Sequence, residues 1–208
     1  QMDFKKFTSQ ASSPTGGYLA LSGYRGQFRG YELTSIKMED ADPIMKWRNE
    51  QIACLHQNEP LTSTQQTEFF NERVKTQFSQ SKPNLILLRF TLENRLIGYS
   101  SLYDFKWQDL RAKAFFLPET ERVQDAFQYG TDCSVLINLL MRIAFMILNL
   151  NKMSMHSFDN RPFHVNAVEA SGMRREGVLR EHTKTEGNWV NVVVASCLRS
   201  EYLKQYPQ

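Results

Sequence analysis

The sequence predicts an α/β protein of the α+β type: one domain with a mixed, mostly antiparallel central sheet of about seven strands and helices on both faces. Segments that alternate polar and apolar residues, as strands do, are interspersed with segments of helical periodicity. Residues 83–118 contain three strand segments separated by short turns, which predicts an antiparallel meander. The strand predicted at 152–158 follows a long apolar helix, so it can reach the sheet only by a parallel crossover.

Composition excludes several classes of protein. The 208 residues are enough to bury a core without a metal ion or a disulfide, and a hydrophobic fraction of 41% excludes a disordered chain. The net charge of +3 comes from intermixed basic and acidic residues, so nucleic acid is not an expected partner. No uncharged apolar run approaches the ~18 residues of a membrane helix and no secretory signal is seen, so we expect a cytoplasmic protein without a membrane partner.

The three cysteines, Cys54, Cys133 and Cys197, are far apart and odd in number. They match neither a disulfide framework nor the ligand spacing of a zinc site, so we expect no metal. Cys133 and Cys197 have no neighbouring His and Asp in the sequence that would indicate a nucleophile, which favours buried thiols.

The chain divides into a leader and a folded domain. Residues 1–30 are rich in Ser, Thr and Gly and predict a flexible leader, although the segment 17–24 could pair as an edge strand. Residues 31–208 are expected to form the domain. It opens with a strand at 31–37 and a helix at 38–56, for which Asp40 or Asp42 is the candidate cap.

The remaining elements follow from caps, turns and periodicity. A second helix at 62–78 begins with the capping-box pattern, with Thr62 or Ser63 as cap. The meander has strands at 83–92, 95–105 and 109–118, with a tight turn at Glu93 and Asn94. After the long apolar helix come the strand at 152–158, a short helix at 162–171 and two final strands within 175–198.

This order, together with "LNLNKMSMHSFDNRPFHVNAVEASGMRREGVLREHTKTEGNWVNVVV", resembles the GCN5-related N-acetyltransferases (GNAT superfamily) over about residues 31–202. The string "MKWRNEQI" resembles the "WRN" signature of the branch that includes ribosomal-protein and sugar-nucleotide N-acetyltransferases. The resemblance implies an enzyme that transfers an acetyl group directly from acetyl-CoA to a primary amine of a small molecule. "DNRP" and "LREH" favour an amino sugar, carried on a nucleotide, as the acceptor.

Two other functions stay open at this point. One is acetylation of a protein N-terminus or a side-chain amine. The other is a binding module, in which a degenerate acetyltransferase fold works through protein contacts. The sequence does not decide whether the protein forms a homodimer.

The resemblance also assigns the cofactor site. The family holds the pyrophosphate of CoA in a glycine-rich loop before a helix, where backbone N–H groups and the helix dipole favour an anion. That loop falls on the stretch "QYGTDCS", whose residues are Gln128, Tyr129, Gly130, Thr131, Asp132, Cys133 and Ser134. Thr131 and Cys133 stand where the family has glycines, so Gly130 is expected to take over that role. The alternative is the ordinary cap of a core helix.

The strand before this loop is expected to present its backbone to the pantetheine arm through Phe115, Phe116 and Leu117, with Pro118 ending the pairing. Asn160, after the strand at 152–158, is the family's further pantetheine contact or else a helix cap. Lys113 lies in the neighbourhood where many relatives carry a glutamate, so a glutamate base is not expected there.

The chemistry needs a base for the ammonium group and an acid for the departing thiolate. The family's usual tyrosine acid is replaced by Val168, so His164 is a candidate acid, with a solvated helix histidine as the alternative. His182, the histidine of "LREH", is the preferred base, whereas His156 is expected to be a core residue. Trp47, Arg48 and Asn49 are candidates for lining the acceptor pocket; the alternative is a core tryptophan beside a solvated arginine.

Overall fold

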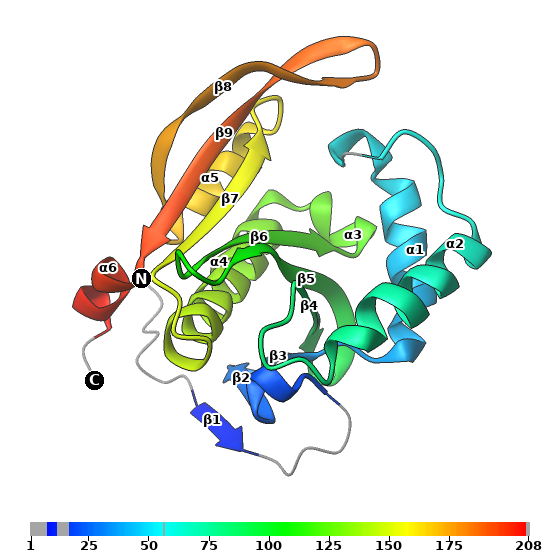
Figure 1. The fold of residues 1–208 in the computed structure, drawn as a ribbon. Helices are drawn as coiled ribbons and strands as arrows, with labels where there is room; N and C mark the ends of the chain where they lie inside the picture. Colours follow the sequence, from blue (N-terminus) through cyan, green and yellow to red (C-terminus); the bar gives the residue numbers. More distant parts are fainter. Residues whose placement is uncertain (1–7, 12–16, 56, 207–208) are drawn as a thin grey trace.

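The computed structural model describes residues 8–11, 17–55 and 57–206, and the strands in these ranges form a single sheet. Its order is β1-β2-β3-β4-β5-β6-β7-β9-β8, and neighbours run antiparallel except β6 and β7, which are parallel (Figure 1). The mixed, mostly antiparallel sheet is therefore confirmed. The strands are β1 (Thr8–Ala11), β2 (Tyr24–Phe28), β3 (Tyr31–Ser35), β4 (Leu85–Leu92), β5 (Arg95–Lys106), β6 (Arg111–Pro118), β7 (Lys152–Phe158), β8 (Arg174–Thr185) and β9 (Asn188–Leu198).

Helices cover both faces of this sheet, as predicted. The pair α1 and α2 lies on one face, and α4 lies on the other with α5 beside it (Figure 1). Thr62 caps α2 through a capping box with Gln65. The α-helices are α1 (Ala41–Glu50), α2 (Ser63–Glu68), α3 (Thr120–Val123), α4 (Ala126–Arg142), α5 (Pro162–Ala170) and α6 (Arg199–Gln205), with a π-helical continuation of α2 at Phe69–Val74 and of α4 at Ile143–Ile147.

The prediction of a flexible leader at 1–30 is wrong for residues 8–11 and 17–30. Residues 19–21 form a short 3₁₀ helix, β2 extends the sheet beside β3, and β1 pairs with β2. The physical reason is burial of apolar side chains that the Ser- and Gly-rich composition obscured: Tyr18, Leu21, Tyr24 and Phe28 are all buried. The Tyr18 hydroxyl also accepts a hydrogen bond from the Leu87 backbone N–H at 2.9 Å. Residues 1–7 and 12–16 lie outside the described residues.

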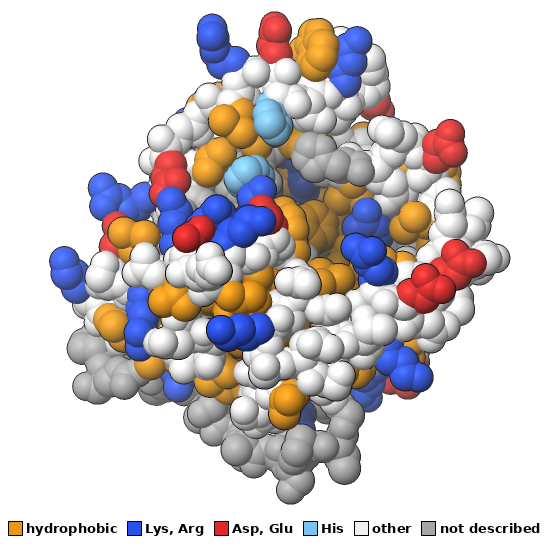
Figure 2. All heavy atoms as spheres, in the orientation of Figure 1, with side chains coloured by type: hydrophobic (Ala, Val, Ile, Leu, Met, Phe, Trp, Pro, Cys, Tyr) orange, Lys and Arg blue, Asp and Glu red, His pale blue; other side chains and the backbone are white. Residues whose placement is uncertain are grey.

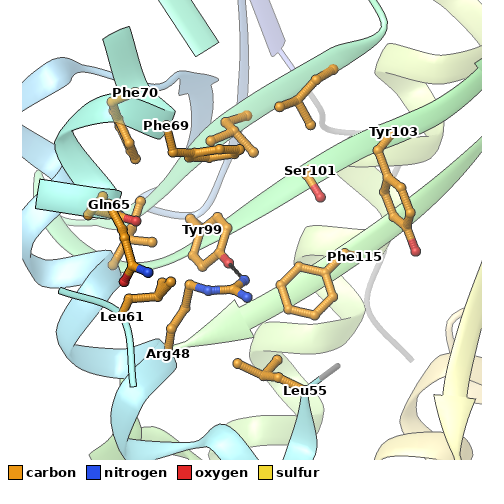
Figure 3. A pocket seen from close by; sticks show the side chains of 14 residues that line it. Arg48, Leu55, Leu61, Gln65, Phe69, Phe70, Tyr99, Ser101, Tyr103 and Phe115 are labelled. Atoms are coloured by element: carbon orange, nitrogen blue, oxygen red, sulfur yellow. Dashed lines mark hydrogen bonds between the residues drawn. The ribbon is translucent and has the colours of Figure 1, made fainter. Parts of the chain in front are cut away.

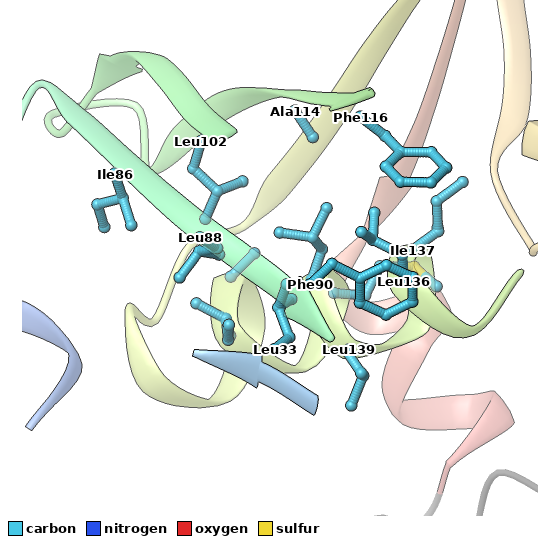
Figure 4. Packing of buried hydrophobic residues seen from close by; sticks show 14 of the residues in the cluster. Leu33, Ile86, Leu88, Phe90, Leu102, Ala114, Phe116, Leu136, Ile137 and Leu139 are labelled. Carbon is cyan, nitrogen blue, oxygen red and sulfur yellow. The ribbon is translucent and has the colours of Figure 1, made fainter. Parts of the chain in front are cut away.

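Alternation along the strands divides the sheet into a core face and a pocket face. Ile86, Leu88 and Phe90 of β4 point towards α4 and are completely buried (Figure 4). Leu136 and Leu139 of α4 pack against that face. The intervening residues of the same strand project towards α1 and α2. The burial of each large apolar side chain contributes about 1.5–3 kcal/mol, which fixes α4 against the sheet.

The segment Ala126–Ile147, which comprises α4 and its π-helical end, is long and apolar enough to cross a membrane by length and composition alone. It is the central core helix of this fold, however, and 67% of its most apolar window is buried inside the protein. Its apolar character is explained by the packing against the sheet.

Candidate active site

The two parallel strands at the centre of the sheet separate halfway along their length. Within the described part of the chain, β6 pairs with β7 only at Arg111–Ala114, opposite Lys152–Met155. From Phe115 to Pro118 β6 continues to pair with β5 on its other side, while β7 pairs with β9. The separation begins where the sequence predicted a strand that presents its backbone, so Phe115, Phe116 and Leu117 lie along the opening.

A pocket of about 360 Å³ lies beside this opening, on the face of the sheet that carries α1 and α2 (Figure 3). In Figure 2 the molecule is hollowed on this face, with apolar side chains on the floor of the hollow and basic side chains at its edge. The volume is within the range of small-molecule sites. Its walls are Ile44, Arg48, Leu55, Leu61, Gln65, Gln66, Phe69, Phe70, Leu85, Leu87, Tyr99, Ser101, Tyr103 and Phe115.

Arg48 is the cationic side chain of the pocket. Its Nη1 donates a hydrogen bond to the Tyr99 hydroxyl at 2.8 Å, and its Nε donates to Gln57 Oε1 at 3.1 Å (Figure 3). Both acceptors are neutral, and no ion pair of Arg48 is found among the described residues. Burial raises the pKa of Tyr99, although the charge of Arg48 acts in the opposite direction, so the phenol keeps its proton at neutral pH.

Of the three residues predicted to line the acceptor pocket, only Arg48 does so. Trp47 is buried in the core, which is the alternative that the sequence left open. Asn49 instead holds the loop between α1 and α2: its Oδ1 accepts from the Leu61 backbone N–H at 2.7 Å, and its Nδ2 donates to the Leu61 carbonyl at 2.9 Å. Asn49 therefore shapes the pocket wall without facing the pocket.

Apart from Phe115, which was predicted on the cofactor side, the other walls were missed by sequence reasoning. Tyr99, Ser101 and Tyr103 lie two residues apart on β5, so their side chains share one face of the sheet. That spacing could have predicted from the sequence that the three side chains lie on one face. The contribution of Phe69 and Phe70 was not readable, because it depends on how α2 and its π-helical continuation pack over the sheet.

The prediction of a pyrophosphate loop at Gln128–Ser134 is wrong in its geometry. These residues belong to α4, which begins at Ala126. Asp125 caps the helix: one carboxylate oxygen accepts hydrogen bonds from the backbone N–H groups of Phe127 at 2.9 Å and Gln128 at 3.0 Å. Two of the N–H groups at the start of the helix are thus already bound to a carboxylate.

The side chains of this stretch do not form a cradle either. Asp132 and Cys133 are completely buried, so neither reaches a ligand. Asp132 does not cap the helix; it accepts hydrogen bonds from the Tyr31 hydroxyl and the Gln128 amide, both at 2.9 Å, and from Arg122. Thr131 donates to the Phe127 carbonyl, and Gly130 has open space at its Cβ position and no positive φ. Gly130 consequently does not take over the role of a loop glycine.

His164 is the buried partner of Tyr129. Its Nδ1 lies 2.5 Å from the Tyr129 hydroxyl, and the two rings form an edge-to-face pair. Burial, helped by the charge of Arg161, lowers the pKa of His164 from 6.5 to about 3. A neutral, enclosed imidazole does not match the predicted acid that faces a thiol, nor the alternative of a solvated helix histidine, and Val165 and Val168 beside it are also buried.

The structure does not bring His182 or Asn160 into the pocket. His182 is exposed on β8, the edge strand separated from β6 by β7 and β9. Asn160 is exposed in the turn that follows β7. The base and pantetheine roles predicted for them stay predictions. Among the described residues no group of three His, Cys, Asp or Glu side chains could hold a metal ion.

Comparisons with known proteins identify one family and similar solved folds. The family model for the acetyltransferase (GNAT) domain matches residues 33–194. The structure of spermidine N-acetyltransferase from Vibrio cholerae in complex with CoA and spermine has a TM-score of 0.72 and 22% identity, covering 84% of this chain and 98% of that one. A dodecameric structure of the enzyme from the same organism, in an intermediate state, has a TM-score of 0.71 and 22% identity, covering 85% and 98%. No curated protein matches the sequence significantly.

Proposed function

Because the chain belongs to the GNAT acetyltransferase family, we propose that it acetylates a primary amine bound in the pocket between α1, α2 and the sheet. Membership of this family makes the protein an N-acetyltransferase that takes its acetyl group from acetyl-CoA. One observation carries this proposal. The Phe115 side chain lines the pocket, and Phe115 is also the first β6 residue beyond the pairing with β7. An amine in the pocket would therefore lie next to the part of β6 that no longer pairs with β7.

The pocket can prepare the amine for attack without a basic side chain. An ammonium group must lose a proton before its nitrogen can form a bond. Apolar walls penalise the charged form, and the Arg48 guanidinium repels it, so both lower the pKa of an amine that binds there. Since no carboxylate or imidazole lines the pocket in the described part of the chain, water is the proton acceptor in this scheme.

The same walls favour an amine attached to an apolar body. Phe69, Phe70, Tyr99, Tyr103 and Phe115 offer ring faces and edges to such a group. The unpaired charge of Arg48 suits a carboxylate, a phosphate or a polar oxygen on the acceptor. The amino-sugar acceptor expected from the sequence receives no support from the comparisons, and it remains one member of a wider class of amines.

A polyamine is the second candidate acceptor. It is favoured by the similar solved structures of spermidine N-acetyltransferase, one of them in complex with CoA and spermine. The pocket chemistry points away from it, because a polyamine carries several positive charges whereas the described lining holds one arginine and no acidic side chain. An unpaired cation placed beside Arg48 would have to lose its hydration without a compensating partner.

The experiment is an acetyl-transfer assay with a panel of acceptors, followed by mass spectrometry of the products. The panel contains arylalkylamines with and without a carboxylate, spermidine, an amino-sugar nucleotide and a peptide with a free N-terminus. We expect the arylalkylamines to be the better substrates, and Ser101→Phe, which fills the pocket, to abolish the reaction. If no amine is acetylated, or if Ser101→Phe acetylates as fast as the wild type while folding normally, the proposal is wrong.

Self-association and cellular location are secondary parts of the proposal. The described surface of the β8–β9 hairpin exposes Val178, Leu179 and Trp189, and one solved relative is described as dodecameric. We expect at least a homodimer, which light scattering on a size-exclusion column would test. The cytoplasm remains the location that we expect for this enzyme.

A further inference from the structure

The start of α4 differs from what recognition of a nucleotide requires. A pyrophosphate needs free backbone N–H groups and a local positive charge. Here the N–H groups of Phe127 and Gln128 are bound to the Asp125 carboxylate, and the N–H of Tyr129 donates to the Asp125 carbonyl. The helix start therefore carries a resident negative charge on its exposed surface.

The space behind the helix start is also filled. Tyr129, which is almost completely buried, lies with its ring 6.1 Å from that of Phe116 on β6 and 5.1 Å from that of Phe163 on α5. Its hydroxyl meets His164. A bulky aromatic ring thus occupies the gap between the end of β6 and α5, next to the position where a small residue would let a phosphate approach the backbone.

Nearby cations do not compensate for this arrangement. Arg122, three residues before Asp125, is engaged by Asp132 through two hydrogen bonds. Arg161 lies over the ring of Phe163, with its Cζ 5.4 Å from the centroid, and it directs its charge towards the enclosed Tyr129 and His164. Residues 124–130 themselves include no Lys or Arg.

At the other end of the donor site, where pantetheine would lie, β6 and β7 are separated beyond Ala114. Beyond Ala114 the edge of β6 that faces β7 has no strand partner, which leaves backbone groups for an amide-containing chain such as pantetheine. The Pro118 carbonyl is not one of them, because it accepts a hydrogen bond from Gln51 Nε2 at 2.9 Å. We propose that this enzyme selects its acyl donor by the pantetheine thioester and hardly by the nucleotide, with Asp125 and Tyr129 as the residues that determine this specificity. The inference rests on the proposed function, because it assumes that the β6 edge is the donor side of the pocket.

The test compares two thiols on the full chain by isothermal titration: CoA, and pantetheine, which lacks all phosphates. We expect their dissociation constants to agree within about threefold. Two or three charge-assisted hydrogen bonds to the pyrophosphate would instead make CoA at least about a hundredfold tighter. A preference of that size overturns the inference.

The variant Asp125→Ser tests the residue itself. Serine is also a good helix cap, so the fold should persist, but the negative charge is gone. We expect CoA to bind about two- to fivefold more tightly and pantetheine to bind unchanged. Asp109→Ser, which removes a carboxylate from the turn between β5 and β6, is the matched control and should change neither constant. If Asp125→Ser leaves the affinity for CoA unchanged, Asp125 does not determine donor specificity.

These outcomes separate the inference from the proposed function. If the two thiols bind alike and no amine is acetylated, the donor inference stands and the proposed acceptor reaction fails. If acetyl transfer proceeds but CoA binds a hundredfold more tightly than pantetheine, only the inference fails. If neither thiol binds, both are wrong.

Discussion

Arg122 and Asp132 join α3 to α4 through a two-point ion pair in which Nε lies 2.5 Å from Oδ2 and Nη2 lies 2.9 Å from Oδ1. The carboxylate is completely buried and also accepts from Tyr31 on β3 and Gln128 on α4. One side chain therefore connects a strand and two helices. Asp132, in the middle of the expected phosphate loop, is thereby held inside the protein as part of α4.

The first prediction follows from that pair. Asp132→Asn should lower the free energy of unfolding by about 3 kcal/mol, because it leaves the Arg122 guanidinium without its buried counter-charge and with Glu119 as a partner only at 3.9 Å. Urea unfolding followed by circular dichroism measures the change. Asp109→Asn is the control, since its pair with Arg111 is exposed and is worth less than about 1 kcal/mol. Equal losses in the two variants would contradict the structural role of the pair.

The second prediction concerns the N-terminal part of the sheet. Phe28 is 3% exposed and belongs to β2, so Phe28→Ala should cost about 3–5 kcal/mol of unfolding free energy. Leu19→Ala is the matched control, because Leu19 is 58% exposed and its loss should change stability by no more than about 0.5 kcal/mol. The same urea titration compares them. If Phe28→Ala were as mild as Leu19→Ala, residues 17–30 would be the leader that composition suggested.

Much of the fold could be predicted because its signals are local. The strand at 152–158 was predicted with the bounds observed for β7, since its alternation is continuous and its neighbours are clear turns. The turn at Glu93 and Asn94 was predicted from residue type, and both residues have a positive φ. β2 was missed because its two apolar residues, Tyr24 and Phe28, are separated by Arg, Gly and Gln. The strand is recognisable only from its pairing with β3.

The site was less accessible to prediction, for a physical reason. Arg48 was identified from a short string, but its neighbour Tyr99 is 51 positions away and meets it only after β5 and α1 have packed. The start of α4 was misplaced because the resemblance assigned a loop to residues that form a helix. Asp125, three residues before Gln128, is of a residue type that commonly caps helices and could have predicted the observed helix start.

The third prediction is a pH dependence of stability. The pKa of His164 is about 3 in the folded protein and 6.5 without its environment, so the unfolded chain takes up a proton first as the pH falls. Stability should therefore decrease below about pH 6.5, by roughly 2 kcal/mol at pH 5. Urea unfolding at pH 7.5 and pH 5 measures the difference.

His164→Gln should reduce that difference between the two pH values, even if the variant is less stable at both, because the comparison is made within each protein. His182→Gln, at the exposed histidine of β8, is the matched control and should retain the wild-type difference. A wild-type difference that persists in His164→Gln would mean that other groups cause the pH dependence.

The last prediction tests Arg48 as the group that lowers the pKa of the bound amine. Arg48→Met keeps the length and apolar stem of the side chain but removes its charge, so the ammonium form becomes easier to hold in the pocket. The apparent pKa in the pH profile of kcat, which reports groups in the bound complex, should rise by about one unit. Arg48→Lys retains a positive charge and should shift the profile less. Tyr99→Phe removes only the hydroxyl that accepts from Arg48 at 2.8 Å, so it tests whether the guanidinium must be held in place. Identical kcat profiles for the wild type and Arg48→Met would leave Arg48 as a binding residue without influence on the proton.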